Sequence, residues 1–168
     1  RLSSGQTYQL LMIFNNPNVT WTAEVLIGMM HACRNIGYHL TIEGVGNYEG
    51  ESFGTPIDYG EIAELIDLSR VDGIILPPPI CFDRQLLKIV REKAVPCVRI
   101  AGTPAQDIQM RVSIDNFAAA YEMTNYLISL GHEKIAFIKG PHDYVASALR
   151  FEGFTAAIRD HGPVSYTH

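Results

Sequence analysis

The sequence predicts an α/β protein in which a doubly wound, mostly parallel sheet carries helices on both faces. Short apolar runs of strand length alternate with segments of helical periodicity from residue 8 to residue 160. The connections between them are short, and such alternation is typical of parallel strands joined by right-handed helical crossovers. Of the 168 residues, 47% are hydrophobic and 18% are charged, a balance typical of a globular chain.

The first strand is predicted at residues 8–14. This segment, YQLLMIF, is continuously apolar, as in a strand that is buried on both faces, and an Asn-Asn-Pro-Asn turn follows it. Thr20 or Thr22 can cap the next helix, which ends before Gly37, a residue that readily adopts the left-handed conformation of a helix stop. A second strand is expected at residues 38–45.

A long loop with several glycines then leads to the next elements. The loop, residues 46–54, lacks the Lys-Ser/Thr pair of a phosphate-binding loop and does not open a helix at once, so we do not expect it to bind a nucleotide. A helix is predicted at residues 58–69, and a strand at residues 71–76 is stopped by three prolines. Asp83 caps a further helix that runs to about residue 93.

Two strands and a helix complete this layer. The strands are predicted at residues 95–101 and 110–114. Asp115 stands where a helix N-cap is expected, and the helix that follows runs to Leu130.

A sharp joint at Leu130-Gly131-His132 separates this layer from the rest of the chain. A strand at residues 135–138, a Gly-Pro loop and a helix at residues 144–160 follow it. Everything before the joint reads as one α/β layer, and everything after it reads as the start of a second layer.

Charge and composition exclude several classes of function. The formal net charge is -5, with Lys and Arg scattered along the chain, which argues against a nucleic-acid surface here. No apolar run reaches about 18 residues and no apolar leader is visible, so neither a membrane span nor a signal peptide is predicted. The three cysteines form no C-x-x-C pair, so we expect buried free thiols and a cytoplasmic protein.

The sequence shows no catalytic or metal-binding pattern. It contains neither a nucleophile elbow nor an H-E-x-x-H motif, and its six histidines do not have the spacing of metal ligands. We therefore expect neither an enzyme nor a bound metal or other cofactor.

Five blocks of sequence stand out together. In chain order they are Asp72-Gly73-Ile74-Ile75-Leu76, Val95-Pro96-Cys97-Val98, Ile114-Asp115-Asn116, the run LGHEKIAFIKG at residues 130–140, and Arg150-x-x-Gly153-Phe154. With this spacing the chain resembles the effector-binding region of the lactose/galactose-repressor (LacI/GalR) family of transcriptional regulators. The block that begins Leu-Gly-His is the most specific of the five.

The resemblance implies a periplasmic-binding-protein-like core of two Rossmann-like lobes that close on a small molecule. By this match residues 1–7 are a linker from a missing DNA-binding head, residues 8–130 are the N-terminal lobe, residues 131–162 are the incomplete start of the C-terminal lobe, and residues 163–168 are a tail. Because the rest of the second sheet is absent, we expect residues 133–160 to pack irregularly or to exchange with a second copy.

The expected binding site lies beyond the carboxyl ends of the strands, where open parallel sheets bind ligands. A sugar-like effector needs planar polar groups and an aromatic platform. Trp21 is either such a platform or a helix-end anchor in the core, and Asn15 is either a polar contact, as often in the family, or a turn residue. Asn47 and Phe82 are candidates on loops at the same edge, and Arg99 is either a pocket charge or a sheet-end residue.

The second lobe is expected to contribute further contacts. Arg150 falls on the Arg-x-x-Gly-Phe pattern, whose arginine often reaches ligand hydroxyls in the family, and a guanidinium fork suits vicinal oxygens. The alternative is a surface charge on a helix. Asp143 and Tyr144 are neighbours in the preceding loop, and Asp115 is either a ligand contact or no more than a helix N-cap.

These features predict the effector-sensing domain of a DNA-binding transcriptional regulator. A sugar or sugar-like metabolite would change lobe closure and thereby the affinity of the DNA-binding heads for operator DNA. The extra apolar residues Leu26, Ile27 and Met30 indicate either a homodimer through the first helix or a deeply buried helix. The alternative function is that of a periplasmic-type sugar-binding protein in a transport system.

Overall fold

The computed structural model describes residues 5–15, 19–46, 57–101, 110–140, 144–162 and 165–167. The chain forms two compact units, Arg1–Val112 and Ser113–His168. Each unit has its own sheet and its own hydrophobic core.

The first unit is built on a five-stranded parallel sheet with the order β2-β1-β3-β4-β5. Its strands are β1 (Gln9–Phe14), β2 (His39–Gly44), β3 (Gly73–Leu76), β4 (Cys97–Ile100) and β5 (Met110–Val112). Each strand lies within the segment that the apolar pattern predicts. The predicted fold class, a doubly wound parallel sheet, is confirmed.

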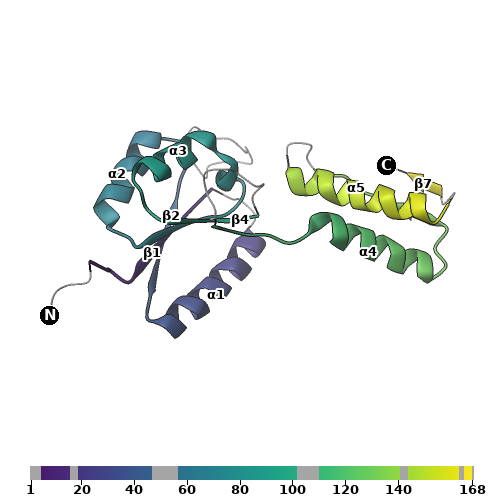
Figure 1. Cartoon of the computed structure of the whole chain (residues 1–168), viewed down its shortest axis with the longest axis horizontal. Helices are drawn as coiled ribbons and strands as arrows, with labels where there is room; N and C mark the ends of the chain where they lie inside the picture. Colours follow the sequence, from purple (N-terminus) through teal and green to yellow (C-terminus); the bar gives the residue numbers. More distant parts are fainter. Residues whose placement is uncertain are drawn as a thin grey trace. The chain divides into compact units, whose positions relative to one another are not determined.

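Helices cover both faces of this sheet. They are α1 (Val19–Ile36), α2 (Tyr59–Ser69) and α3 (Arg84–Glu92), with the short 3-10 helix η1 (Ile80–Phe82) after β3. The helices α2 and α3 lie on one side of the sheet and α1 on the other (Figure 1). The main core lies on the α2–α3 side and is formed by Leu11, Ile13, Ile62, Ile66, Val71, Ile74, Leu76, Ile80, Cys81, Leu86, Val90 and Cys97.

Aspartate caps are predicted correctly, but the start of α1 is not. The Asp83 side chain accepts a hydrogen bond from the Leu86 N–H at 2.8 Å and so caps α3. Helix α1 already begins at Val19, so Thr20 and Thr22 lie inside it and neither is its cap. Thr22 is buried inside the helix.

The second unit contains α4 (Asn116–Ser129), β6 (Lys134–Ala136), α5 (Val145–Asp160) and β7 (Ser165–Thr167). The helices α4 and α5 lie side by side (Figure 1). Strands β6 and β7 pair in parallel, so part of the predicted tail forms a strand. The core of this unit consists of Ile135, Phe154 and Ile158, with Leu127, Ile128, Phe137 and Phe151 packed against it.

Gly153 allows α4 and α5 to approach each other closely. A Cβ atom at this position would lie 2.2 Å from the carbonyl oxygen of Phe117 and 3.1 Å from the amide nitrogen of Tyr121. Both atoms belong to the α4 backbone and cannot move aside as a flexible side chain can. The glycine of the Arg-x-x-Gly-Phe pattern therefore has a packing role in this chain.

The division between the units differs from the predicted lobe boundary. The sequence predicts a joint at Leu130-Gly131-His132, whereas the structure divides between Val112 and Ser113. Because α5 packs on α4, the described residues of 133–140 and 144–160 pack regularly, in contrast to the irregular packing that the sequence suggested. An exchange with a second copy stays a prediction. Where the lobes of a longer protein divide stays a prediction.

Candidate functional site

The carboxyl edge of the first sheet is the natural place for a ligand. Strand β1 lies between β2 and β3, so the connection to β2 and the later return to β3 leave on opposite sides of it. In open α/β sheets ligands bind at such a switch point, beyond the carboxyl ends of the strands. Asn15 follows β1 at this point, and Trp21 lies in the first turn of α1.

Asn15 and Trp21 supply two different kinds of contact at this edge. The Oδ1 atom of Asn15 is buried and has no hydrogen-bond partner among the described residues. A buried acceptor of this kind is costly unless a donor reaches it, and a ligand hydroxyl is a suitable donor. The Trp21 side chain is half-buried, which is compatible with both interpretations of this residue.

Phe82 lies at the same edge, in the short helix η1 that follows β3. The carbon at the centre of the Arg99 guanidinium lies 6.0 Å from the centre of the Phe82 ring. The Arg99 Nε–H donates a hydrogen bond of 2.8 Å to the carbonyl oxygen of Cys81, and only 2% of Arg99 is exposed. Arg99 is therefore a buried cation that reaches from β4 to η1.

The thiols near Arg99 are not reactive groups. Cys33, Cys81 and Cys97 are free and buried, as the sequence predicts. Burial raises the pKa of Cys81 to about 12 and that of Cys97 to about 11, although the positive charge of Arg99 acts in the opposite direction. Both thiols are protonated at neutral pH and do not act as nucleophiles.

A hydrogen bond connects the start of α2 to Asp83, the residue between η1 and α3. The Tyr59 hydroxyl donates a hydrogen bond of 2.8 Å to Oδ2 of Asp83. This bond, followed by desolvation, raises the pKa of Tyr59 above its ordinary value. Asp83 thus caps α3 and binds α2 at once. The sequence identified the cap but contained no signal for the tyrosine partner, which is distant in the chain.

In the second unit, Arg150 and Asp115 both have partners in or near α4. The Arg150 Nε–H donates a hydrogen bond of 2.8 Å to Oδ1 of Asn116, and Asn116 is buried. Asp115 caps α4 by accepting a hydrogen bond of 2.9 Å from the Ala118 N–H, which confirms the N-cap interpretation. Tyr144 immediately precedes α5 and is half-buried.

The structure places the predicted residues in two groups. Asn15, Trp21 and Phe82 belong to the first unit, at the carboxyl edge of its sheet. Asp115, Tyr144 and Arg150 belong to the second unit. Asn47 and Asp143 lie outside the described residues. Arg99, which the sequence left as either a pocket charge or a sheet-end residue, is buried beside Phe82. Asn116 is an additional polar residue beside Arg150, and the sequence assigned it no site role.

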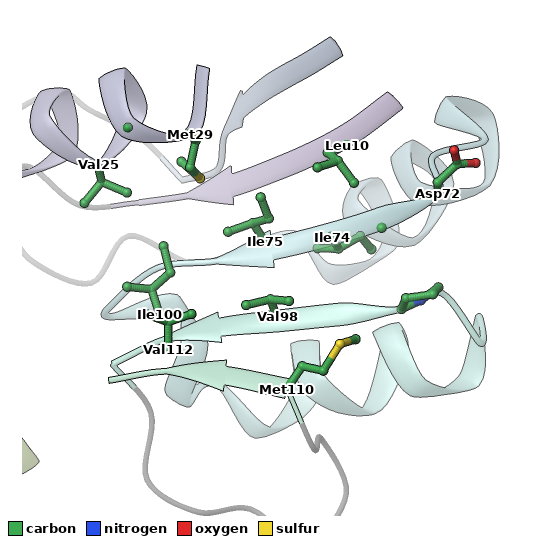
Figure 2. Close-up of a pocket in the computed structure, with 13 residues that line it drawn as sticks. Leu10, Val25, Met29, Asp72, Ile74, Ile75, Val98, Ile100, Met110 and Val112 are labelled. Carbon is green, nitrogen blue, oxygen red and sulfur yellow. The ribbon is translucent and has the colours of Figure 1, made fainter. Parts of the chain in front are cut away.

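An apolar groove of about 610 Å³ lies on the α1 side of the first sheet (Figure 2). Val25 and Met29 of α1 line one side, and Asp72 is the charged residue of the lining. The remaining lining residues are Leu10, Gly28, Gly73, Ile74, Ile75, Pro96, Val98, Ile100, Met110 and Val112. A sugar needs several polar partners, so this groove does not have the chemistry of a sugar site.

Two further properties concern the described residues as a whole. No described helix combines the length and apolar character needed to cross a membrane. Within the described ranges, His, Cys, Asp and Glu form no group of three or more that could hold a metal ion.

Comparison with known proteins shows which family the chain is similar to. The family model described as periplasmic binding proteins and sugar binding domain of LacI family matches residues 7–168. The HTH-type transcriptional regulator MalR of Staphylococcus xylosus is 28% identical over 138 residues, which are 80% of this chain and 38% of MalR. The HTH-type transcriptional repressor CytR of Escherichia coli K12 is 29% identical over 139 residues, which are 82% of this chain and 38% of CytR.

A solved structure shows the same fold. The Cra transcriptional dual regulator from Pseudomonas putida, in complex with fructose 1-phosphate, is similar with a TM-score of 0.68 and 19% identity. The similarity covers 96% of this chain and 57% of that chain. The chain thus spans less than half of the length of MalR and CytR and somewhat more than half of the Cra chain.

Proposed function

The chain belongs to the family of periplasmic binding proteins and LacI sugar-binding domains, and from this premise we propose that it is the effector-sensing part of a DNA-binding transcriptional regulator. The observation that carries the proposal is the family match over residues 7–168, together with relatives that are themselves named transcriptional regulators or repressors. None of these relatives is named as an enzyme, so we assign the chain a binding function without catalysis.

The effector that fits best is a sugar or a sugar-like metabolite. The buried Oδ1 of Asn15, which has no hydrogen-bond partner within the described ranges, suits a hydroxyl donor, and the rings of Trp21 and Phe82 suit the C–H face of a sugar. Arg150 is the proposed contact from the second unit, with Asp115 and Tyr144 as further candidates. The structural neighbour Cra has fructose 1-phosphate bound, which supports this class of ligand.

Operator DNA and a second copy of the protein are the proposed macromolecular partners. The relatives carry helix-turn-helix names, so DNA binding is assigned to a segment of the whole protein outside this chain. Ile27 and Met30 on α1 are 53% and 56% exposed, and such an apolar surface supports a homodimer through this helix. A cytoplasmic location follows from the proposed role.

A ligand screen tests the proposed function. The full-length product of the gene should be heated with maltose, cellobiose, ribose, fructose 1-phosphate or adenosine over a range of concentrations. A true effector raises the melting temperature with concentration, because a ligand at about 100 times its Kd stabilises the folded state by about 2.7 kcal/mol. Operator binding should change with the same compound in a gel-shift assay.

Two results would count against the proposal. The first is a panel of sugars and nucleosides that leaves both the melting temperature and DNA binding unchanged. The second is a gene that encodes a signal peptide upstream of this chain in place of a helix-turn-helix, which would favour the sugar-transport alternative.

A further inference from the structure

Arg99 is a charged residue in apolar surroundings. It lies in β4, pairs in register with Leu76 of β3, and follows Cys97 on the same face of the strand. Leu76 and Cys97 are both buried members of the main core. A charge in such a place is costly unless hydrogen bonds hold it, so the groups that hold Arg99 bear on its role.

The contacts of Arg99 point to the short helix η1. Its Nε–H donates to the Cys81 carbonyl oxygen at 2.8 Å, and its guanidinium carbon lies 6.0 Å from the centre of the Phe82 ring. The Cys81 thiol also lies 3.8 Å from the carbonyl oxygen of Ala101, directly after β4. These contacts connect η1 to the end of β4.

The internal hydrogen bonds of η1 are local. The Cys81 N–H donates to the carbonyl oxygen of Pro77 at 3.0 Å, and the Phe82 N–H donates to that of Pro79 at 3.0 Å. A single 3-10 turn has poorer hydrogen-bond geometry than an α-helix. Contacts from outside the turn are therefore important for holding Phe82 in one orientation.

We propose that Arg99 is a positioning residue of the effector site, which fixes η1 and thereby holds the Phe82 ring at the carboxyl edge of the sheet. The proposal rests on the proposed function, in which Phe82 contacts the effector. Arg99 itself is buried and acts through Phe82. An apolar residue at position 99 would pack in the core without a charge to compensate, but it would lack the hydrogen bond that connects β4 to η1.

Hydrogen exchange tests the positioning step without any ligand. Arg99→Met and Arg99→Lys should be compared with wild type in the full-length protein, with Arg84→Met as the control because Arg84 is exposed at the start of α3. We expect the amides of Cys81 and Phe82 to exchange about tenfold to a hundredfold faster in both Arg99 variants, the range for a lost hydrogen bond from a charged donor. If Arg99→Met does not fold, amide exchange in Arg99→Lys decides whether Arg99 fixes η1.

Binding tests the link to the effector. With whichever compound of the sugar panel stabilises wild type, Arg99→Met should weaken binding about tenfold or more while the melting temperature of the free protein changes little. The two residues can be compared in a double-mutant cycle of Arg99→Met and Phe82→Ala. The double variant should bind the compound no more weakly than Phe82→Ala alone, because Arg99 acts through the Phe82 ring.

The outcomes separate the two proposals. Exchange and affinity within about twofold of wild type in both Arg99 variants, or fully additive losses in the cycle, overturn the role of Arg99. If no panel compound binds wild type, the proposed function fails, whereas the exchange of the η1 amides still decides whether Arg99 fixes the turn.

Discussion

Among the described residues, Arg150 makes one local hydrogen bond, and its other N–H groups suit the proposed ligand contact. Its Nε–H donates to Asn116, and the side chain lies at an exposed position of α5. A guanidinium has five N–H donors, so this bond orients the fork without occupying all of it. The geometry is therefore compatible with a contact to vicinal hydroxyls, and a substitution must separate this role from the structural bond.

Arg150→Ala should strongly reduce the effector-induced rise in melting temperature at a given effector concentration. Removal of a charged donor that is bound to a ligand typically costs about 1.5–3 kcal/mol, equivalent to about tenfold to a hundredfold in Kd. Asn116→Ala removes the local bond but keeps the arginine, and Arg159→Ala removes an arginine from the last turn of the same helix. Both controls should keep the rise. An undiminished rise in Arg150→Ala, measured by differential scanning fluorimetry, would remove Arg150 from the site.

Asp72 connects the entry to β1 with the start of β3. Its carboxylate accepts hydrogen bonds from the Thr7 N–H at 2.9 Å, the Thr7 hydroxyl at 3.0 Å and the Tyr8 N–H at 2.9 Å. The backbone hydrogen bond from Thr7 is the main cause that lowers the pKa of Asp72 below its ordinary value of 3.8, and burial opposes it. Asp72, the first residue of the Asp72-Gly73-Ile74-Ile75-Leu76 block, thus connects the segments that precede β1 and β3 at the amino end of the sheet.

This lowered pKa gives a defined pH dependence of stability. A group whose pKa is lower in the folded state stabilises the protein above its unfolded pKa, and this contribution disappears as the pH falls through the folded value. The free energy of unfolding of wild type, measured in urea, should therefore fall more steeply from about pH 5 to pH 3 than that of Asp72→Asn. Glu64→Gln, at an exposed position of α2, is the control and should follow wild type.

Among the elements, the α4–α5 pair shows the clearest dependence on a single residue. The two helices meet where Gly153 of α5 faces the backbone of Phe117 and Tyr121 in α4. Phe154, the next residue, is 2% exposed and lies in the core of the same unit. The pair therefore combines a close backbone contact with a buried aromatic anchor at neighbouring positions.

Gly153→Ala should destabilise the second unit by about 1–3 kcal/mol, the usual cost of overpacking. Gly28→Ala is the matched control, because a Cβ atom at Gly28 in α1 would meet nothing within 4 Å. That variant should be neutral or should stabilise the protein by about 0.5–1 kcal/mol, because alanine is the better helix former. Urea unfolding followed by circular dichroism measures both. Equal changes in the free energy of unfolding for Gly153→Ala and Gly28→Ala would contradict the close contact between Gly153 and the α4 backbone.

For the whole molecule, α1 is the proposed surface for a second copy. Its exposed apolar side chains are unusual for a helix that packs on a sheet with its other side. Cys33 is 5% exposed and marks the inward face, whereas Ile27 and Met30 are more than half exposed. The helix thus presents apolar residues on two sides, as the sequence pattern indicated.

Met30→Glu should convert a dimer of the full-length protein into monomers. A charge buried without a partner in an interface is strongly unfavourable, whereas the same residue on a free surface is not. Sedimentation velocity measures the oligomeric state, and circular dichroism verifies the fold. Leu68→Glu is the control, because Leu68 is 74% exposed on α2, away from α1. A dimer that survives Met30→Glu would exclude this surface.

Local signals in the sequence determined the order and type of the elements from β1 to α5, apart from the short helix η1. Strand β1 is a continuous apolar run, and aspartates cap α3 and α4, because these features depend on residues that are neighbours in the chain. The resemblance carried by five short blocks identified the family. The positions of Asn15, Trp21 and Phe82 at one sheet edge followed from the alternation of strands and helices, because parallel strands bring their carboxyl ends together.

Contacts between distant residues decided the rest. The packing of α5 on α4 depends on the close approach at Gly153, a contact that no local pattern contains. The burial of Arg99 depends on the turn that follows a different strand, since its hydrogen-bond acceptor is the carbonyl of Cys81. Sequence patterns report which residues form an element, whereas the approach of two elements depends on the shapes of both surfaces at once.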